Sequence, residues 1–76
     1  MSKLVIFKTI TEKQAWELLN RNEAGIYPKE DLGQFLITNE DGTFSAISNS
    51  IECIWLLDFK TRFEAVRWLL ETDKEE

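Results

Sequence analysis

The sequence contains no histidine, and this absence removes several kinds of active site at once. Histidine is the commonest metal ligand and the usual general base in proteins. It also activates most serine and cysteine nucleophiles. The sequence therefore gives no support for a Ser–His or Cys–His catalytic pair. We expect no bound metal ion and no other cofactor.

Cysteine and glycine are also scarce. The single cysteine, Cys53, has no partner for an internal disulfide and lies in an apolar run, so we expect it to be a small buried hydrophobic residue. The three glycines are Gly25, Gly33 and Gly42, and their wide spacing excludes a glycine-rich loop around a phosphate. We therefore expect no small-molecule substrate.

Long apolar runs are missing as well. No stretch approaches the roughly 18 apolar residues of a membrane-spanning helix. The first eight residues contain an apolar stretch that is too short to form the apolar region of a signal peptide. We therefore expect a cytoplasmic protein without a membrane partner.

Acidic residues outnumber basic ones, and the formal net charge is −5. The basic residues are dispersed along the chain, whereas binding along a phosphate backbone needs several clustered cations. Direct nucleic-acid binding is therefore disfavoured. The alternative is a small nucleic-acid-associated regulator that would use Lys60, Arg62 and Arg67, which lie near the second predicted helix.

Two adjacent carboxylate pairs are the only candidates for acid–base chemistry that remain. Glu40 and Asp41 precede Gly42 in a typical turn sequence, where aspartate bonds to nearby backbone. Glu30 and Asp31 lie in a polar loop, and a small enzyme that uses one of them is a further alternative. We expect both pairs to be solvated and expect no catalysis.

The elements can be predicted from periodicity and turn signals. With 76 residues the chain is long enough for one domain, residues 1–76, with a charged tail at 72–76 that we expect to fray. A strand is expected at 3–8, in the interior of the sheet because it is apolar on both faces. A capping box of Thr11 and Gln14 begins a helix that runs to about Asn22, followed by a loop at 25–34.

The second half of the chain predicts a hairpin, a third strand and another helix. The hairpin arms are 35–38 and 43–48, joined by a turn with Asp-Gly at 41–42. A third strand is expected at 51–58, and a capping box of Thr61 and Glu64 begins a helix that runs to about Glu71. The order β-α-β-β-β-α indicates an α+β fold with a mostly antiparallel sheet and two helices packed on it.

The apolar side chains are more numerous than this small fold needs. The tripeptide Trp-Leu-Leu occurs in the third strand and again in the second helix, where apolar residues spread over about 220° of the helical wheel. The third strand is apolar on both faces, and we expect the two helices to cover only one face of the sheet. Either a compact core absorbs these side chains or they bind a partner. The candidate partner-binding residues are Trp16, Trp55, Leu57, Phe63 and Trp68.

Residues 41–69 carry a pattern of short motifs: Asp41-Gly42, Ala46-Ile47, Asn49-Ser50, Trp55, Asp58-Phe59-Lys60-Thr61, Glu64-Ala65 and Trp68-Leu69. This pattern resembles small uncharacterised proteins of Gram-positive bacteria and their phages. The resemblance implies a phage or mobile-element origin and carries over no activity or site residue.

These observations together favour a non-catalytic protein–protein interaction module. We expect it to self-associate, with a homodimer as the default because symmetric dimers are the commonest oligomers. The other expectation is that it binds a host protein, and in either case we expect a phage or prophage accessory or inhibitor protein. An acidic chain would be steered toward a basic partner surface.

The capping box at Thr61 makes a first testable prediction. Thr61→Ala should lower the free energy of unfolding by about 0.5–2 kcal/mol, because the second helix loses the acceptor for one of its first backbone amides. Urea unfolding followed by circular dichroism measures the change. An unaltered midpoint would show that Thr61 does not cap the helix.

Overall fold

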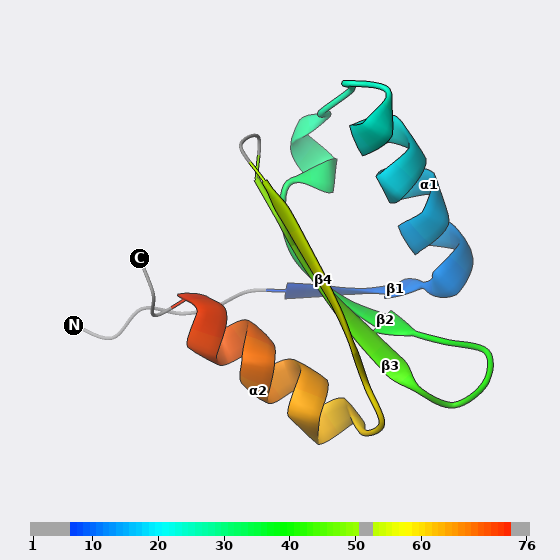
Figure 1. Cartoon of the computed structure of the whole chain (residues 1–76), viewed down its shortest axis with the longest axis vertical. Helices are drawn as coiled ribbons and strands as arrows, with labels where there is room; N and C mark the ends of the chain where they lie inside the picture. Colours follow the sequence, from blue (N-terminus) through cyan, green and yellow to red (C-terminus); the bar gives the residue numbers. More distant parts are fainter. Residues whose placement is uncertain (1–6, 51–52, 74–76) are drawn as a thin grey trace.

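The computed structural model describes residues 7–50 and 53–73 and shows a four-stranded sheet with two helices (Figure 1). In chain order the elements are β1 (Phe7–Thr11), α1 (Glu12–Glu23), a 3-10 turn (Lys29–Asp31), β2 (Gly33–Thr38), β3 (Phe44–Asn49), β4 (Ile54–Phe59) and α2 (Arg62–Asp73). The predicted order β-α-β-β-β-α and the α+β class are confirmed.

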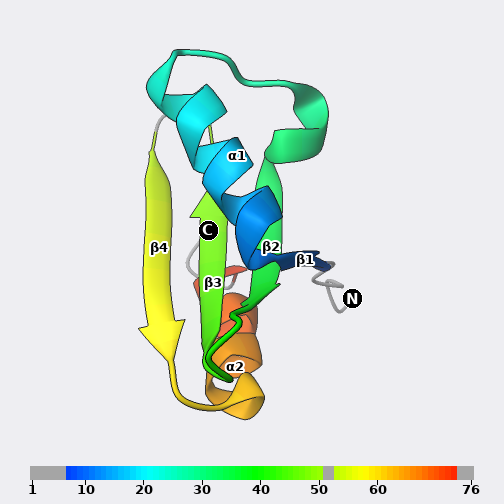
Figure 2. The same cartoon turned by 90° about the vertical axis from the view of Figure 1, so that its right-hand side faces the viewer.

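The strands lie side by side in the order β1-β2-β3-β4. β1 and β2 are parallel because α1 carries the chain back between them, and the other two pairs are antiparallel. Figure 2 shows β1 and β4 at opposite edges of the sheet. The prediction of an interior first strand is wrong for the described part of the chain, where β1 has β2 as its one neighbour; residues 3–6 of that prediction lie outside the described residues.

The two middle strands place apolar side chains on both faces of the sheet. Phe35, Leu36 and Ile37 in β2 are consecutive and all buried, so they point alternately to opposite faces. Two separate core clusters result. One joins α1 to the sheet and contains Ala15, Leu18, Phe35, Ile37 and Ile47. The other joins α2 to the sheet and contains Leu36, Ala46, Ala65 and Leu69.

The helices therefore lie on opposite faces of the sheet, as Figure 1 shows. The expectation that both helices cover one face is wrong. Strands that are apolar on both faces need cover on both, and one helix on each face meets that need in the middle of the sheet. We call the two faces the α1 side and the α2 side.

The first helix signal forms both bonds of its predicted capping box, and the second forms the side-chain cap of Thr61. Thr11 Oγ1 accepts from the Gln14 backbone amide at 3.1 Å, and Gln14 Oε1 accepts from the Thr11 amide at 2.9 Å, which completes the first capping box. Thr61 Oγ1 accepts from the Glu64 amide at 3.2 Å, as a helix cap should. In the hairpin turn Gly42 has φ +92°, a conformation that favours glycine.

The loop that precedes β2 is held by an ion pair with a buried carboxylate, which the sequence did not predict. Asp31 is 3% exposed, and its carboxylate accepts from Arg21 Nε at 2.6 Å and Arg21 Nη2 at 2.8 Å. The hydrogen bond to Asp31 raises the pKa of Arg21. The Asp31 backbone carbonyl also accepts from Asn49 Nδ2 at 2.8 Å. The expectation that Asp31 is solvated is therefore wrong, because α1 brings a guanidinium to it.

This ion pair makes a second prediction. Asp31→Ala should lower the free energy of unfolding by about 1–3 kcal/mol, because it removes both charge-assisted hydrogen bonds of Arg21. The cost stays at this level since the Arg21 side chain is 41% exposed and can reach water when its partner is lost. Urea unfolding of Asp31→Ala beside Glu30→Ala is the measurement. Glu30 is the exposed neighbour, so equal changes in both variants would contradict a structural role for Asp31.

Candidate protein-binding surface

β4 lies at one edge of the sheet with a run of four apolar residues, Ile54, Trp55, Leu56 and Leu57. The exposed fractions are 58% for Trp55, 46% for Leu56 and 42% for Leu57. Ile54 is half-buried against the α1-side cluster. We call residues 54–57 the β4 surface. A run of this kind on an edge strand is unusual in a protein that stays alone.

The helices cover the β4 surface only in part: Ile54 packs against the α1-side cluster, whereas Trp55, Leu56 and Leu57 remain exposed. α1 packs on β1 and β2, and α2 packs mainly on β3. The contact of α2 with β4 includes Trp68 and Phe59, whose ring centroids are 6.3 Å apart with the rings tilted by 42°. That contact lies at the end of β4, beyond the β4 surface.

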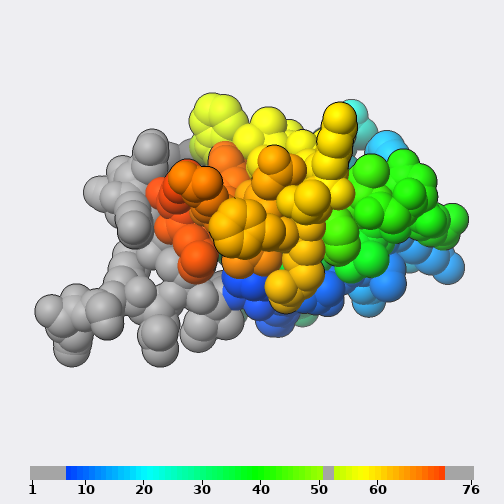
Figure 3. Space-filling view, turned by 90° about the horizontal axis from the view of Figure 1, so that it is seen from below, coloured from blue at the N-terminus to red at the C-terminus, as the bar shows by residue number. Residues whose placement is uncertain are grey.

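The four side chains of the β4 surface divide between the two faces of the sheet. Trp55 and Leu57 lie opposite Ser48 and Ala46 of β3 and share the α2 side with Ala46. Figure 3 shows β4 (yellow) and α2 (orange) next to each other. Ile54 shares the α1 side with its cluster, and Leu56, two positions further along, points the same way.

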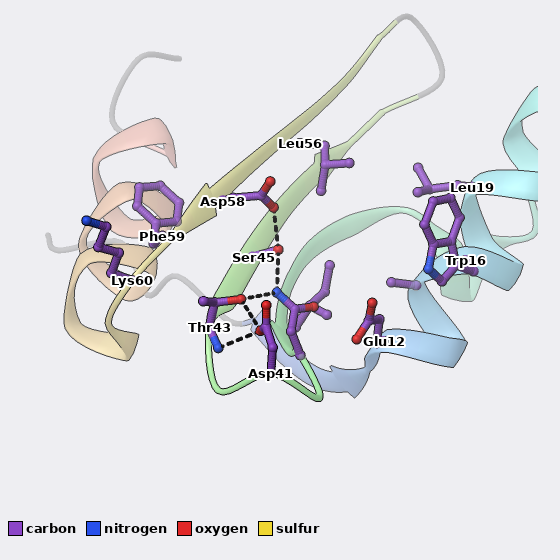
Figure 4. A pocket seen from close by; sticks show the side chains of 13 residues that line it. Glu12, Trp16, Leu19, Asp41, Thr43, Ser45, Leu56, Asp58, Phe59 and Lys60 are labelled. Carbon is purple, nitrogen blue, oxygen red and sulfur yellow. Dashed lines mark hydrogen bonds between the residues drawn. The ribbon is translucent and has the colours of Figure 1, made fainter.

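A groove runs between α1 and β4 on the α1 side. A hollow of about 630 Å³ has Trp16 and Leu19 of α1 on one wall and Leu56 and Asp58 of β4 on another (Figure 4). A second hollow of about 490 Å³ shares Trp16 and Leu19 and extends to Ile54. Trp16 is 60% exposed, so its indole borders both hollows without filling either.

One end of this groove is polar and firmly ordered, as the dashed lines in Figure 4 show. Ser45 Oγ donates to Asp58 at 2.6 Å, and Asn39 Nδ2 donates to Ser45 Oγ at 3.0 Å and to Thr43 Oγ1 at 3.1 Å. Thr43 donates to Asp41 through its hydroxyl at 2.6 Å and its amide at 3.0 Å, and these bonds lower the pKa of Asp41. The carboxylates of Asp41 and Asp58 thus accept hydrogen bonds from neutral donors. This arrangement links the hairpin turn to β3 and β4.

The structure brings together only some of the predicted partner-binding residues. Trp55 and Leu57 share one face of β4, while Trp16 lies on the opposite side of the sheet. Trp68 is half-buried and belongs to the α2-side cluster. Phe63 is 73% exposed, but it lies about 140° around α2 from Trp68 and so faces away from β4.

Two residues of the β4 surface, Ile54 and Leu56, were not among the predicted partner-binding residues. The apolar run that pointed to Trp55 and Leu57 also pointed to Ile54 and Leu56. A strand that is apolar on both faces exposes both faces when it lies at the edge of a sheet. Cys53, which we expected to be buried, is exposed. It lies just before β4, in the second hollow beside α1, where no side chain covers it fully.

One cation of the nucleic-acid alternative is paired with a carboxylate. Arg67 Nε contacts Glu71 Oε2 at 3.0 Å, one helical turn away. This ion pair weakens the attraction of Arg67 for phosphate. Lys60 lies at the edge of the α1–β4 groove (Figure 4).

Within residues 7–50 and 53–73, no helix is both long and apolar enough to cross a membrane. The same part of the chain holds no group of three or more histidine, cysteine, aspartate or glutamate side chains that could bind a metal ion. Comparison of the chain with protein families, with curated proteins and with solved structures finds no match. The structure thus defines an α+β domain with an exposed apolar edge strand, and any statement of function must rest on that surface.

The different surroundings of two tryptophans make a third prediction. Trp68→Ala should lower the free energy of unfolding by about 1.5–3 kcal/mol, because it removes an indole from the α2-side cluster. Trp55→Ala should change it by less than about 1 kcal/mol, because its side chain is mostly in water. Urea unfolding at high dilution, where the chain is alone, compares the two. A larger loss for Trp55→Ala would show that the β4 surface is core.

Proposed function

We propose that this protein is a non-catalytic interaction module that self-associates through the β4 surface. The observation that carries the proposal is a run of four apolar residues on an edge strand, with Trp55, Leu56 and Leu57 each more than 40% exposed. Fully burying one such side chain is worth about 1.5–3 kcal/mol. A partner that covers the β4 surface therefore has a substantial source of binding energy.

The two edges of the sheet differ in a way that supports the choice of β4. Edge strands in soluble proteins are commonly protected from pairing by lysine, other charges, proline or short length. β1 carries Lys8 and Thr9, both exposed, within five residues. β4 carries one charge, Asp58, near its end, whereas the β4 surface has no charge and no proline, so this part of the edge is open to another strand.

Self-association and the alternatives respond to salt in opposite directions. Two copies that each carry a formal charge of −5 repel one another, and salt screens this repulsion. Binding to nucleic acid through Lys60, Arg62 and Arg67, or to a host protein with a basic surface, would instead weaken as salt is added. The sign of the salt effect therefore separates the proposal from both alternatives.

The proposal makes a fourth prediction. Sedimentation velocity should show reversible association of the wild type that increases with protein concentration and with salt. Trp55→Glu should stay monomeric at concentrations where the wild type associates, because it places a charge in the apolar contact. Circular dichroism should show that the variant keeps its fold, since Trp55 is mostly exposed.

Thr9→Glu is the matched control, because it adds the same charge to the other edge strand. This variant should associate like the wild type. A wild type that remains monomeric at millimolar concentration would rule out self-association. In that case, binding of labelled DNA or RNA that declines with salt would support the nucleic-acid alternative.

A further inference from the structure

We infer that two copies of this chain join their β4 strands antiparallel, about a two-fold axis that passes through Leu56, and so continue one sheet across both copies. This inference rests on the proposed self-association and adds its geometry. It commits to a second copy of the same chain because the free edge of β4 is complementary to itself. Figure 2 shows this edge, which lies opposite β1.

The hydrogen-bonding pattern of β4 fixes which backbone groups face outward. The Ser50 amide donates to the Cys53 carbonyl at 2.9 Å, which marks these two residues as a hydrogen-bonded pair of the β3–β4 ladder. Such pairs occur at every second position of an antiparallel ladder. Positions 55, 57 and 59 therefore bond to β3. The residues whose amides and carbonyls point to the free edge are Ile54, Leu56 and Asp58.

A two-fold axis through Leu56 uses all of these outward groups. A two-fold axis perpendicular to the sheet places the α1 sides of both copies on the same face. Residues on the same face therefore pair across the axis, so the outward residues Ile54, Leu56 and Asp58 pair with one another. With Leu56 on the axis, Leu56 pairs with its copy and Ile54 pairs with Asp58 of the second copy. An axis at either other outward residue, or between two of them, leaves an outward residue of β4 without a partner in the opposite strand.

The side chains agree with this register. On the α2 side, Trp55 lies opposite Leu57 of the second copy, an aromatic–aliphatic pair of the kind that stabilises neighbouring strands. On the α1 side, the two Leu56 side chains meet at the axis. The two Asp58 carboxylates are four positions apart, about 13 Å along the strands. That separation exceeds the screening length of about 8 Å at physiological salt, so they repel little.

An axis through Asp58 would be unfavourable because of repulsion between carboxylates. It would place two carboxylates directly opposite one another, which destabilises a pair of strands. The Asp58 carboxylate is also held in place by the 2.6 Å bond from Ser45, so it cannot easily turn away. The register is therefore selected by charge as well as by the number of backbone hydrogen bonds.

The area available suits a weak, reversible dimer. A tryptophan offers roughly 150–250 Å² when fully buried, and a leucine roughly the lower end of that range. With exposed fractions of 58%, 46% and 42%, the three most exposed residues of the β4 surface offer at most roughly 250–300 Å² of apolar area per copy. Because somewhat over half of a typical interface is apolar, the total area buried in both copies would be at most roughly 1,000 Å². This value is at the lower limit for a specific interface.

Disulfide trapping tests the register. Leu56→Cys is prepared in a Cys53→Ser background and oxidised mildly at a concentration where the wild type associates. Two residues that face each other as a hydrogen-bonded pair have Cα atoms about 5.5 Å apart, which is within the range of a disulfide. Non-reducing electrophoresis should show a covalent dimer.

The matched control is Asp58→Cys in the same background, because it lies on the same face of the same strand. Its two Cα atoms would be about 13 Å apart. Leu56→Cys should therefore cross-link at least about tenfold faster, since a disulfide needs Cα atoms within about 7 Å. The wild-type Cys53 should also fail to cross-link within the dimer, because it lies three positions from the axis.

Leu56→Pro provides a second, independent test. The Leu56 amide faces outward, so proline there removes no bond to β3, and an edge strand tolerates it. The variant should keep its circular dichroism spectrum and sediment as a monomer. Leu57→Pro, which removes an amide that bonds to β3, should instead destabilise the fold.

The possible outcomes separate the register from the function. If the wild type associates but Leu56→Cys cross-links no faster than Asp58→Cys, or if Cys53 cross-links readily, this register is wrong while self-association stands. A Leu56→Pro variant that folds and still dimerises would also overturn the inference. A wild type that does not associate would overturn the proposed function itself.

Discussion

β2 and β3 present apolar side chains to both faces of the sheet, so each face needs its own cover. Phe35 and Ile37 point to α1, whereas Leu36 between them points to α2. The two α-helices of the described residues therefore lie one on each face. The connections allow this arrangement. α1 joins the parallel strands β1 and β2 across one face, and α2 follows β4 onto the other.

The same constraint leaves the edges of the sheet uncovered. One helix is too narrow to cover four strands, and both helices lie over the part of the sheet where the apolar side chains of β2 and β3 are concentrated. β1 carries exposed polar residues, but β4 carries an apolar run on both of its faces. The exposed surface of β4 is thus a direct consequence of how the core is built, and it lies at the edge where the proposed second copy would pair.

Much of this architecture could be predicted from local signals. The capping box at Thr11 and the side-chain cap at Thr61 act within three residues, and the turn at Gly42 needs only a glycine at a positive φ. Two features could not be predicted in this way. The face on which each helix packs depends on contacts between distant elements, as does the bond from Arg21 to Asp31, ten residues away. The sequence pattern of Asp31 in a polar loop resembles that of an ordinary solvated carboxylate.

The candidate partner-binding residues also divide into a part that the sequence shows and a part that depends on the fold. The apolar excess of the third predicted strand was visible because Trp55 and Leu57 alternate with Ile54 and Leu56 along it. The strand order was not visible, and it decides that β4 lies at an edge and exposes both faces. Phe63 and Trp68 were grouped together from the width of one apolar arc, whereas the structure packs Trp68 against Phe59 and leaves Phe63 on the far flank of α2.

Amide hydrogen exchange followed by NMR at several protein concentrations would test the central claim most directly. In dilute solution the outward amides of Ile54, Leu56 and Asp58 should exchange rapidly, while those of Trp55 and Leu57, which bond to β3, stay protected. As concentration rises and the chain associates, the three outward amides should become protected, with Leu56 at the centre. Association that leaves the Leu56 amide exchanging as fast as in dilute solution would contradict the account.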